Sequence, residues 1–187
     1  MLEKLKAEVL LAYQELNRYG LDKYSRGAVS AIDRESGMIV MKSARDAFIV
    51  DMQGKILEGT QANASDIQSH ISIYQAFPKL GGVVQPHARF ATIFAQIGMD
   101  IPVLGSFHKD CFRAQIPCAA SVSEMGSTFR ERSIDPLKTP AALVLSHSAY
   151  AWGETALDAV NNAAALEETA NMAYHTMQLD PGIQPLQ

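Results

Sequence analysis

Hydrophobic residues recur along this chain at two spacings, one typical of helices and the other typical of strands. Residues 2–19 follow the helical spacing, and Gly20 stands where a glycine commonly ends a helix. A second long helical pattern starts after Thr155, which forms a capping-box sequence with Asp158. Its apolar positions recur four and three residues apart, at Ala159, Ala163, Leu166, Ala170, Ala173 and Met177. Because this stripe is mostly alanine, we expect a neighbouring element to pack very close to the helix.

The segment between these two patterns mixes strands with shorter helices. Short β-type runs separated by turn residues over 28–59 predict two hairpins. Ser65 followed by Gln68 is a capping-box sequence, so we expect a helix that begins at Ser65 and ends before Pro78. The remaining expected elements are a buried strand in 81–87 that ends at its proline, helix 89–96, strand 101–104, helix 124–131 and strand 141–145. This order predicts an α/β protein in which helices cover both faces of a largely antiparallel sheet.

The composition is that of an ordinary globular protein, and it narrows the classes of function. With 187 residues the chain fits one domain spanning 1–187, and its prolines and glycine near the end predict a flexible tail over 180–187. Apolar residues make up 48% and charged residues 19% of the sequence, which excludes a disordered chain. A formal net charge of −4 gives no excess of basic residues for a nucleic-acid-binding surface, so small molecules or proteins are the expected partners.

The sequence also bears on location and redox environment. No apolar run reaches the roughly 18 residues of a membrane span, and the charged start over 1–6 does not resemble a signal peptide. We therefore expect a cytoplasmic protein without a membrane partner. Cys111 and Cys118 are the only cysteines, and their spacing matches neither a redox or zinc pair nor a disulfide framework. We interpret them as small buried apolar residues.

Four polar segments stand at the ends of apolar elements and are candidates for chemistry. They are Ser65-Asp66, Gln85-Pro86-His87, His108-Lys109-Asp110 and Ser146-His147-Ser148. In a strand, residues two apart point to the same side, so Gln85 and His87 would share one face. A catalytic zinc site needs three protein ligands around an open position, and a histidine in place of Gln85 would complete a ligand pair of this kind.

Longer stretches around these segments resemble one protein family. The stretches are residues 81–102, 105–110 and 116–118, together with 29–34, Ser65-Asp66, and 143–166, which contains Ala151-Trp152-Gly153. This combination covers most of the chain. It is similar to the class II aldolase/adducin family and is closest in motif to its L-ribulose-5-phosphate 4-epimerase branch. The resemblance implies a three-layer α/β/α fold with a largely antiparallel central sheet, and a homotetramer with active sites between neighbouring subunits.

The resemblance also assigns roles to individual residues. Family members hold zinc through a His-x-His pair and a third histidine, and the matching positions here are Gln85, His87 and His147. An amide oxygen is a weaker zinc ligand than an imidazole nitrogen, so we expect zinc with weakened affinity, another divalent ion, or no metal. Asp66 and Asp110 match catalytic acids of the epimerase site. Without the resemblance, Asp66 could equally cap its helix, and Asp110 could be a solvated loop carboxylate.

The phosphate-binding positions of the family differ more strongly in this sequence. The matching segments contain Gly27, Arg45 and Ser65, but three polar side chains of the family are replaced by alanine at positions 28, 44 and 64. Arg26 and Arg45 add two cations. An arginine can grip a phosphate or carboxylate through two parallel hydrogen bonds, although both residues could also be ordinary surface charges.

Three functional hypotheses follow from these matches and differences. The first is metal-dependent aldol-type carbon–carbon bond cleavage or epimerisation of a small sugar phosphate or related hydroxy acid. The second is a non-catalytic, adducin-like scaffold or regulatory protein that has lost full zinc and phosphate binding. The third is that Gln85 binds a harder ion and that the substrate has changed with it. The family's further acid–base histidine lies in a C-terminal extension of an adjacent subunit, and we expect no counterpart of it within these 187 residues.

Overall fold

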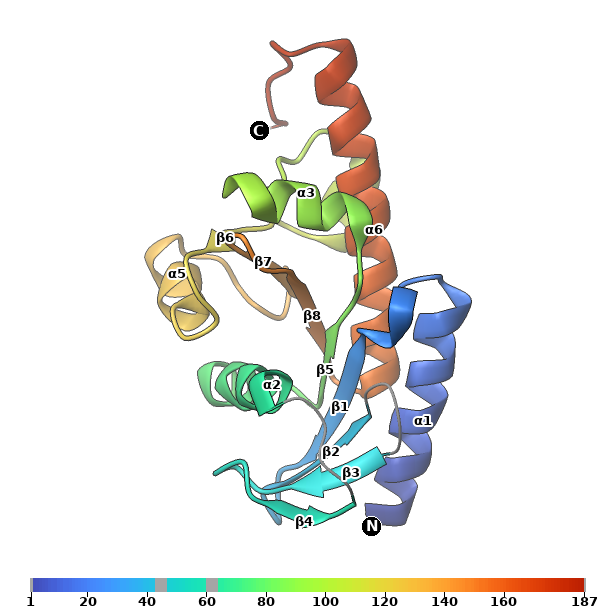
Figure 1. Ribbon diagram of the computed structural model, residues 1–187. Helices are drawn as coiled ribbons and strands as arrows, with labels where there is room; N and C mark the ends of the chain where they lie inside the picture. The colour runs from blue at the N-terminus through green and yellow to red at the C-terminus, as the bar shows by residue number, and fades with distance from the viewer. Residues whose placement is uncertain (1, 43–46, 60–63, 187) are drawn as a thin grey trace.

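The computed structural model describes residues 2–42, 47–59 and 64–186, which fold into one sheet with helices packed against it (Figure 1). The strands are β1 (Ala28–Asp33), β2 (Met38–Lys42), β3 (Ala47–Val50), β4 (Ile56–Glu58), β5 (Gly82–Gln85), β6 (Cys118–Ala119), β7 (Ala141–Val144) and β8 (Ala149–Gly153). The helices are α1 (Leu2–Arg18), α2 (Ala64–Ala76), α3 (Arg89–Ile97), α4 (Ser106–Cys111), α5 (Met125–Glu131) and α6 (Ala156–Leu179), with a short 3-10 turn η1 (Lys23–Ser25) before β1.

The sheet is mixed but mostly antiparallel. Its strand order is β4-β3-β2-β1-β5-β8-β7-β6. Within the described strands, β6 and β7 form the parallel pair, and the other neighbouring strands pair in antiparallel fashion. The two expected hairpins are present as β1–β2 and β3–β4. The α/β class with a largely antiparallel sheet is therefore confirmed.

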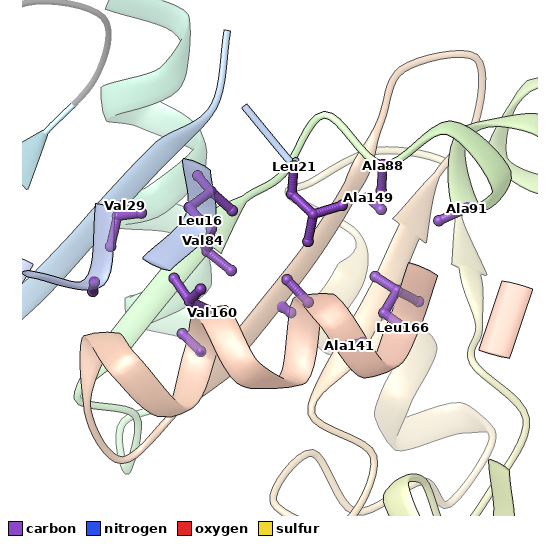
Figure 2. Packing of buried hydrophobic residues seen from close by; sticks show 14 of the residues in the cluster. Leu16, Leu21, Val29, Val84, Ala88, Ala91, Ala141, Ala149, Val160 and Leu166 are labelled. Atoms are coloured by element: carbon purple, nitrogen blue, oxygen red, sulfur yellow. The ribbon is translucent and has the colours of Figure 1, made fainter. Parts of the chain in front are cut away.

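Two hydrophobic clusters connect the sheet to different helices. The alanine-rich cluster joins the sheet to α1, α3 and α6, and its alanines are Ala12, Ala31, Ala88, Ala91, Ala95, Ala141, Ala149, Ala151, Ala156, Ala159, Ala163, Ala170 and Ala173. Figure 2 shows Val160 and Leu166 of α6 beside buried side chains of the strands in this cluster. The aromatic cluster joins the sheet to α2 and α5, and its aromatic residues are Phe48, Tyr74, Phe77, Phe129, Tyr150 and Trp152. In Figure 1, α1 and α6 lie on one side of the sheet and α2 and α5 lie on the other.

Two paired glycines allow α6 to start directly against the sheet. Gly82 of β5 is the register partner of Gly153 of β8. A Cβ atom at Gly82 would lie 2.3 Å from the backbone oxygen of Thr155, and one at Gly153 would lie 2.5 Å from Cβ of Asp158. Thr155 caps the helix, because its Oγ1 accepts a hydrogen bond from the Asp158 amide while the Asp158 carboxylate accepts one from the Thr155 amide. The predicted capping box and the close packing of the alanine stripe are both confirmed.

One expected boundary is confirmed, and others are wrong for identifiable reasons. The strand expected to end at its proline is β5, which ends at Gln85 because Pro86 has no amide hydrogen to continue the ladder. The strand expected over 101–104 is replaced by a single bridge between Ile101 and Ile116, and Pro102 again interrupts the ladder. Helix α2 begins at Ala64, so Ser65 lies inside its first turn and does not cap it. Helix α4 and strand β8 are not predicted by the pattern. Helix α4 has six residues, too few to show a helical period, and β8 is buried at successive positions, so it shows no alternation of apolar and polar residues.

No helix in the described part of the chain is long and apolar enough to cross a membrane. At the C-terminus, the amide of Leu186 donates a hydrogen bond of 2.7 Å to the carbonyl of Val103.

Candidate functional site

Gln85 and His147 are brought together at one end of the sheet by the pairing of β5 with β8. Gln85 is the last residue of β5, and His147 lies in the turn that joins β7 to β8. The hydroxyl of Ser148 contacts both: it accepts a hydrogen bond from Nε2 of Gln85 at 3.1 Å and lies 2.9 Å from Nδ1 of His147. Ser148 therefore couples the orientations of two of the three candidate metal ligands.

The turn that carries His147 is held firmly by backbone hydrogen bonds. The amide of His147 donates to the carbonyl of Val144 at 3.0 Å, and the amide of Val144 donates to the carbonyl of Ser148 at 2.8 Å. Ser146 adopts a left-handed conformation with φ of 55° and donates its amide to the carbonyl of Ala95. A non-glycine residue with positive φ is uncommon and indicates that the surrounding structure fixes the turn.

His87 lies beyond the end of β5 and is oriented by different contacts. Its amide donates to the carbonyl of Leu21 at 2.7 Å, and its exposed ring stands edge-on to Tyr24, with ring centroids 6.1 Å apart. Tyr24 itself has a positive φ of 62° and an exposed side chain. Within the described residues, the ring of His87 makes no hydrogen bond with Gln85 or His147. The structure thus joins two of the expected ligands through the Ser148 hydroxyl, and the third lies two residues along the chain from Gln85.

Asp66 lies beside His147, in the first turn of α2. Its carboxylate is half-buried and accepts a hydrogen bond of 3.3 Å from the hydroxyl of Ser65. Burial raises the pKa of Asp66 above its ordinary value, while the Ser65 hydroxyl and the charge of His147 act in the opposite direction. A carboxyl group with a raised pKa in the neighbourhood of an imidazole is suited to proton transfer.

The remaining candidates lie in separate places. Gly27 is buried, its amide donates to the Asp22 carboxylate at 2.6 Å, and a Cβ atom there would lie 2.8 Å from the end of the Leu16 side chain, so a larger residue would require neighbouring side chains to shift. Ser65 is exposed, and Arg45 falls outside the described residues. Asp110 is exposed in α4 and makes no hydrogen bond or ion pair with the other candidates in the described part of the chain.

A set of buried polar residues behind the site was not identified as functional from the sequence. Ser30 of β1 contacts His70 and Tyr74 of α2, and Tyr150 of β8 lies beside His70. The contacts of His70 are those of a buried structural residue. Ser30 and His70 are 40 positions apart in the sequence, so no local pattern predicts their contact.

The donor atoms at this end of the sheet suit a divalent cation in part. With Nδ1 of His147 engaged by Ser148, the second ring nitrogen Nε2 is the one available as a ligand, which is a common arrangement for metal-binding histidines. The amide nitrogen of Gln85 is likewise engaged, so its oxygen is the available atom. Across residues 2–42, 47–59 and 64–186, no group of three or more His, Cys, Asp or Glu side chains is placed to hold a metal ion. The expected donors therefore stay the imidazoles of His87 and His147 and the carboxamide of Gln85.

Comparisons with known proteins agree on one family. The family model described as "Class II Aldolase and Adducin N-terminal domain" matches residues 7–174. L-ribulose-5-phosphate 4-epimerase UlaF of Salmonella paratyphi A and that of Salmonella typhi are each 41% identical to this chain over an alignment of 206 positions. The alignment covers 99% of this chain and 90% of the relative.

Solved structures show the same fold at much lower identity. An L-fuculose 1-phosphate aldolase superposes with a TM-score of 0.81 at 18% identity, covering 98% of this chain and 89% of that chain. The L-fuculose-1-phosphate aldolase of Thermus thermophilus gives a TM-score of 0.72 at 22% identity, covering 97% of this chain and 100% of that chain.

Proposed function

This chain belongs to the class II aldolase and adducin family, and from that premise we propose that it catalyses metal-dependent aldol-type cleavage or epimerisation of a small sugar phosphate or related hydroxy acid. The observation that carries the proposal is the meeting of Gln85 and His147 at the Ser148 hydroxyl, with Asp66 beside His147. Identity of 41% over 99% of the chain to UlaF supports an enzyme, and it makes L-ribulose 5-phosphate the first substrate to test.

The residues that would hold the metal are His87, His147 and Gln85, the last through its amide oxygen. A bound divalent cation would act as the sink for the electron pair released when a carbon–carbon bond breaks. A carboxamide in place of an imidazole predicts weaker affinity for zinc and leaves room for a harder ion. Ser148 holds Gln85 and His147 in fixed orientations, so the two donors need little rearrangement.

Two carboxylates would move protons in the reaction. Cleavage requires that the hydroxyl of the departing carbon lose its proton, so that the O–H electron pair forms the new carbonyl. We assign this step to Asp110, and we assign proton transfer on the other side of the substrate to Asp66, whose raised pKa favours keeping a proton available. In epimerisation the aldehyde fragment turns over before the carbon–carbon bond re-forms, and the new alkoxide takes a proton from Asp66, which balances the proton that Asp110 removed from the original hydroxyl.

The substrate phosphate would be bound by Gly27, Ser65 and Arg45. The buried amide of Gly27 already donates to Asp22, so a phosphate there would depend on Ser65 and on the arginines. Arg26 is exposed one residue before Gly27 and adds a second cation to this region.

Assembly and location complete the proposal. Asp110 is exposed on α4, apart from the other candidates, so it would serve the site of a neighbouring subunit in a homotetramer. One domain over 1–187 with a flexible tail over 180–187, a three-layer α/β/α arrangement and a cytoplasmic location belong to the same proposal. The alanine-rich and aromatic clusters, with their different helices, support the three layers.

Elemental analysis of protein purified without chelators or added metal, followed by an assay with L-ribulose 5-phosphate, tests this function. We expect a bound divalent metal that is lost in His147→Ala, together with conversion of the substrate to its 4-epimer or to aldol-cleavage products. Metal-free protein that neither binds added zinc, manganese or magnesium nor turns over the sugar phosphate would refute the proposal.

A further inference from the structure

Three buried side chains form a hydrogen-bonded triplet in the middle of the aromatic cluster. The hydroxyl of Ser30 lies 2.7 Å from Nδ1 of His70 and 2.9 Å from the hydroxyl of Tyr74. All three residues are inaccessible to solvent. Burial lowers the pKa of His70 to about 3, so this imidazole is neutral at ordinary pH and carries one N–H and one lone pair.

Two buried atoms without partners separate this triplet from the candidate site. Nε2 of His70 and the hydroxyl of Tyr150 are both buried and make no hydrogen bond with the described residues. Their rings are neighbours, with centroids 6.3 Å apart at an angle of 77°. A buried polar atom without a partner is unfavourable. Because these two atoms lie on adjacent rings and make no direct hydrogen bond, they are natural partners through one bridging water molecule.

Tyr150 also reaches towards the site on its other side. Its ring lies beside the ring of His147, with centroids 6.3 Å apart. Burial raises the pKa of the Tyr150 hydroxyl, and the side chains of Ser69 and Ser148 act in the opposite direction. Ser148 is the residue that contacts Gln85 and His147. A line of polar groups therefore runs from the triplet, through Tyr150, to the candidate metal ligands.

The hydroxyl of Ser148 has one proton and two lone pairs, and this arithmetic limits what His147 can do. One lone pair accepts from the amide of Gln85. If Nδ1 of His147 carries a proton and donates to the second lone pair, Ser148 must donate to Tyr150, and Nε2 of His147 keeps its lone pair. If Ser148 instead donates to Nδ1, then Nε2 of His147 carries the proton and cannot bind a metal.

We propose that Tyr150 joins the Ser30–His70–Tyr74 triplet to Ser148, and that this chain of hydrogen bonds holds His147 in the tautomer whose Nε2 lone pair is free to bind a ligand. Tyr150 is then a positioning residue. The inference deepens the proposed function, since the role of His147 as a metal ligand rests on it. Its physical basis is that each group in the chain accepts one hydrogen bond and donates the next. Ser148 donates to Tyr150, Tyr150 donates through one water molecule to Nε2 of His70, and Nδ1 of His70 donates to Ser30, which donates to Tyr74.

The test is the tautomeric state of both histidines in metal-free protein. Long-range ¹H–¹⁵N correlation spectra of ¹⁵N-histidine-labelled protein, at about pH 8 where an ordinary imidazole is neutral, distinguish a proton on Nδ1 from one on Nε2. In the unmodified protein we expect His70 and His147 both to carry the proton on Nδ1.

Ser30→Ala gives the sharper variant. Without the Ser30 oxygen, Nδ1 of His70 loses its acceptor, so the proton moves to Nε2 and the direction of the whole chain reverses. His147, at the opposite end of the chain from Ser30, should then change to the Nε2–H form. Tyr150→Phe interrupts the chain, so the Nδ1–H form of His147 should fall from nearly all molecules to a minority, and zinc affinity should fall about tenfold.

Tyr174→Phe is the matched control, because the Tyr174 hydroxyl is bonded to Gln178 outside this chain, and it should change neither histidine. Near-ultraviolet circular dichroism confirms that each variant is folded. The proposal is overturned if His147 carries its proton on Nε2 in the unmodified protein, or if it stays on Nδ1 in both Ser30→Ala and Tyr150→Phe. Protein that shows the coupled tautomers but binds no metal would refute the proposed function and leave the hydrogen-bond chain in place.

Discussion

The alanine-rich and aromatic clusters use the same sheet in different ways. In the alanine-rich cluster, small side chains and the Gly82–Gly153 pair bring α6 close to the strands. The stability of this cluster therefore depends on the small volume of its side chains. In the aromatic cluster, large rings surround Ser30 and His70, so it depends on hydrogen bonding as well as packing. The alanine-rich cluster fixes distances, and the aromatic cluster orients groups near the candidate site. Substitutions on the two sides should therefore fail in different ways.

Asp66→Asn, at the border of the aromatic side, should give the largest effect. Loss of the proton-transfer group is expected to lower kcat by roughly 10²–10⁴-fold. In contrast to kcat, the free energy of unfolding should increase in this variant. Because the pKa of Asp66 is raised on folding, the native state binds the extra proton, and stability falls as pH rises from the ordinary value through the raised one. Above that interval the asparagine variant should be the more stable protein.

Steady-state kinetics and thermal unfolding on the same samples test this pair of expectations. Glu35→Gln, in the exposed turn between β1 and β2, is the control and should change neither quantity. An Asp66→Asn variant with full kcat would exclude Asp66 from proton transfer.

His70→Gln should reveal the polar character of the aromatic side through pH. An unfolded histidine gains a proton below about pH 6.5, whereas His70 with a pKa of about 3 stays neutral in the native state. Between these values the unfolded chain binds more protons, so stability is full above about pH 6.5 and is lost as the pH falls. At about pH 4.5 this single group accounts for roughly 3 kcal/mol of lost stability.

Urea unfolding at neutral and acidic pH measures this loss. The His70→Gln variant should be less stable at neutral pH and should lose less stability on acidification. His175→Gln, at an exposed position on α6, should follow the unmodified protein. Equal pH dependence in all three proteins would contradict the buried, neutral state of His70.

Ala163→Leu tests the alanine-rich side by adding volume where none is free. Ala163 is fully buried in α6, so the larger side chain should lower the free energy of unfolding by about 1–3 kcal/mol. Glu168→Leu, at an exposed position of the same helix, should change it by less than about 0.5 kcal/mol. The tautomer of His147 should be unchanged in Ala163→Leu. A change there would show that the two sides are not independent.

Thr155→Ala should give the smallest effect. It removes the N-cap of α6 and with it one half of the capping box, at an expected cost of about 1 kcal/mol in unfolding free energy. Thermal unfolding of this variant beside Thr155→Ser, which keeps the hydroxyl, measures the capping contribution. Equal losses in the two variants would mean that the hydroxyl does not stabilise the helix.

The sequence predicted the long elements well because their signals are local. The capping box at Thr155 and the alanine stripe of α6 needed only residues three or four apart, and Gly98 ends α3 in a left-handed conformation, as a glycine after a helical pattern predicts. The sequence also predicts correctly that β5 ends at its proline, Pro86, whereas Pro102 prevents the strand expected over 101–104.

The candidate site was only partly predictable, because its geometry depends on contacts between distant residues. The polar segments containing Gln85 and His147 could be identified from their positions after apolar runs. The contact that couples them could not, since Gln85 and Ser148 are separated by 63 positions and meet only through the pairing of β5 with β8. The roles proposed for His87, Asp110 and Ser65 stay predictions, and Arg45 lies outside the described residues.

The ends of the sheet limit how copies of this chain can associate. The edge strand β4 has three residues and the opposite edge strand β6 has two. Strands this short expose few unpaired amide and carbonyl groups, so they offer little template for another molecule's backbone. Growth by sheet extension, the route to fibrils, is therefore disfavoured at both margins, and association between copies would have to use helices and loops.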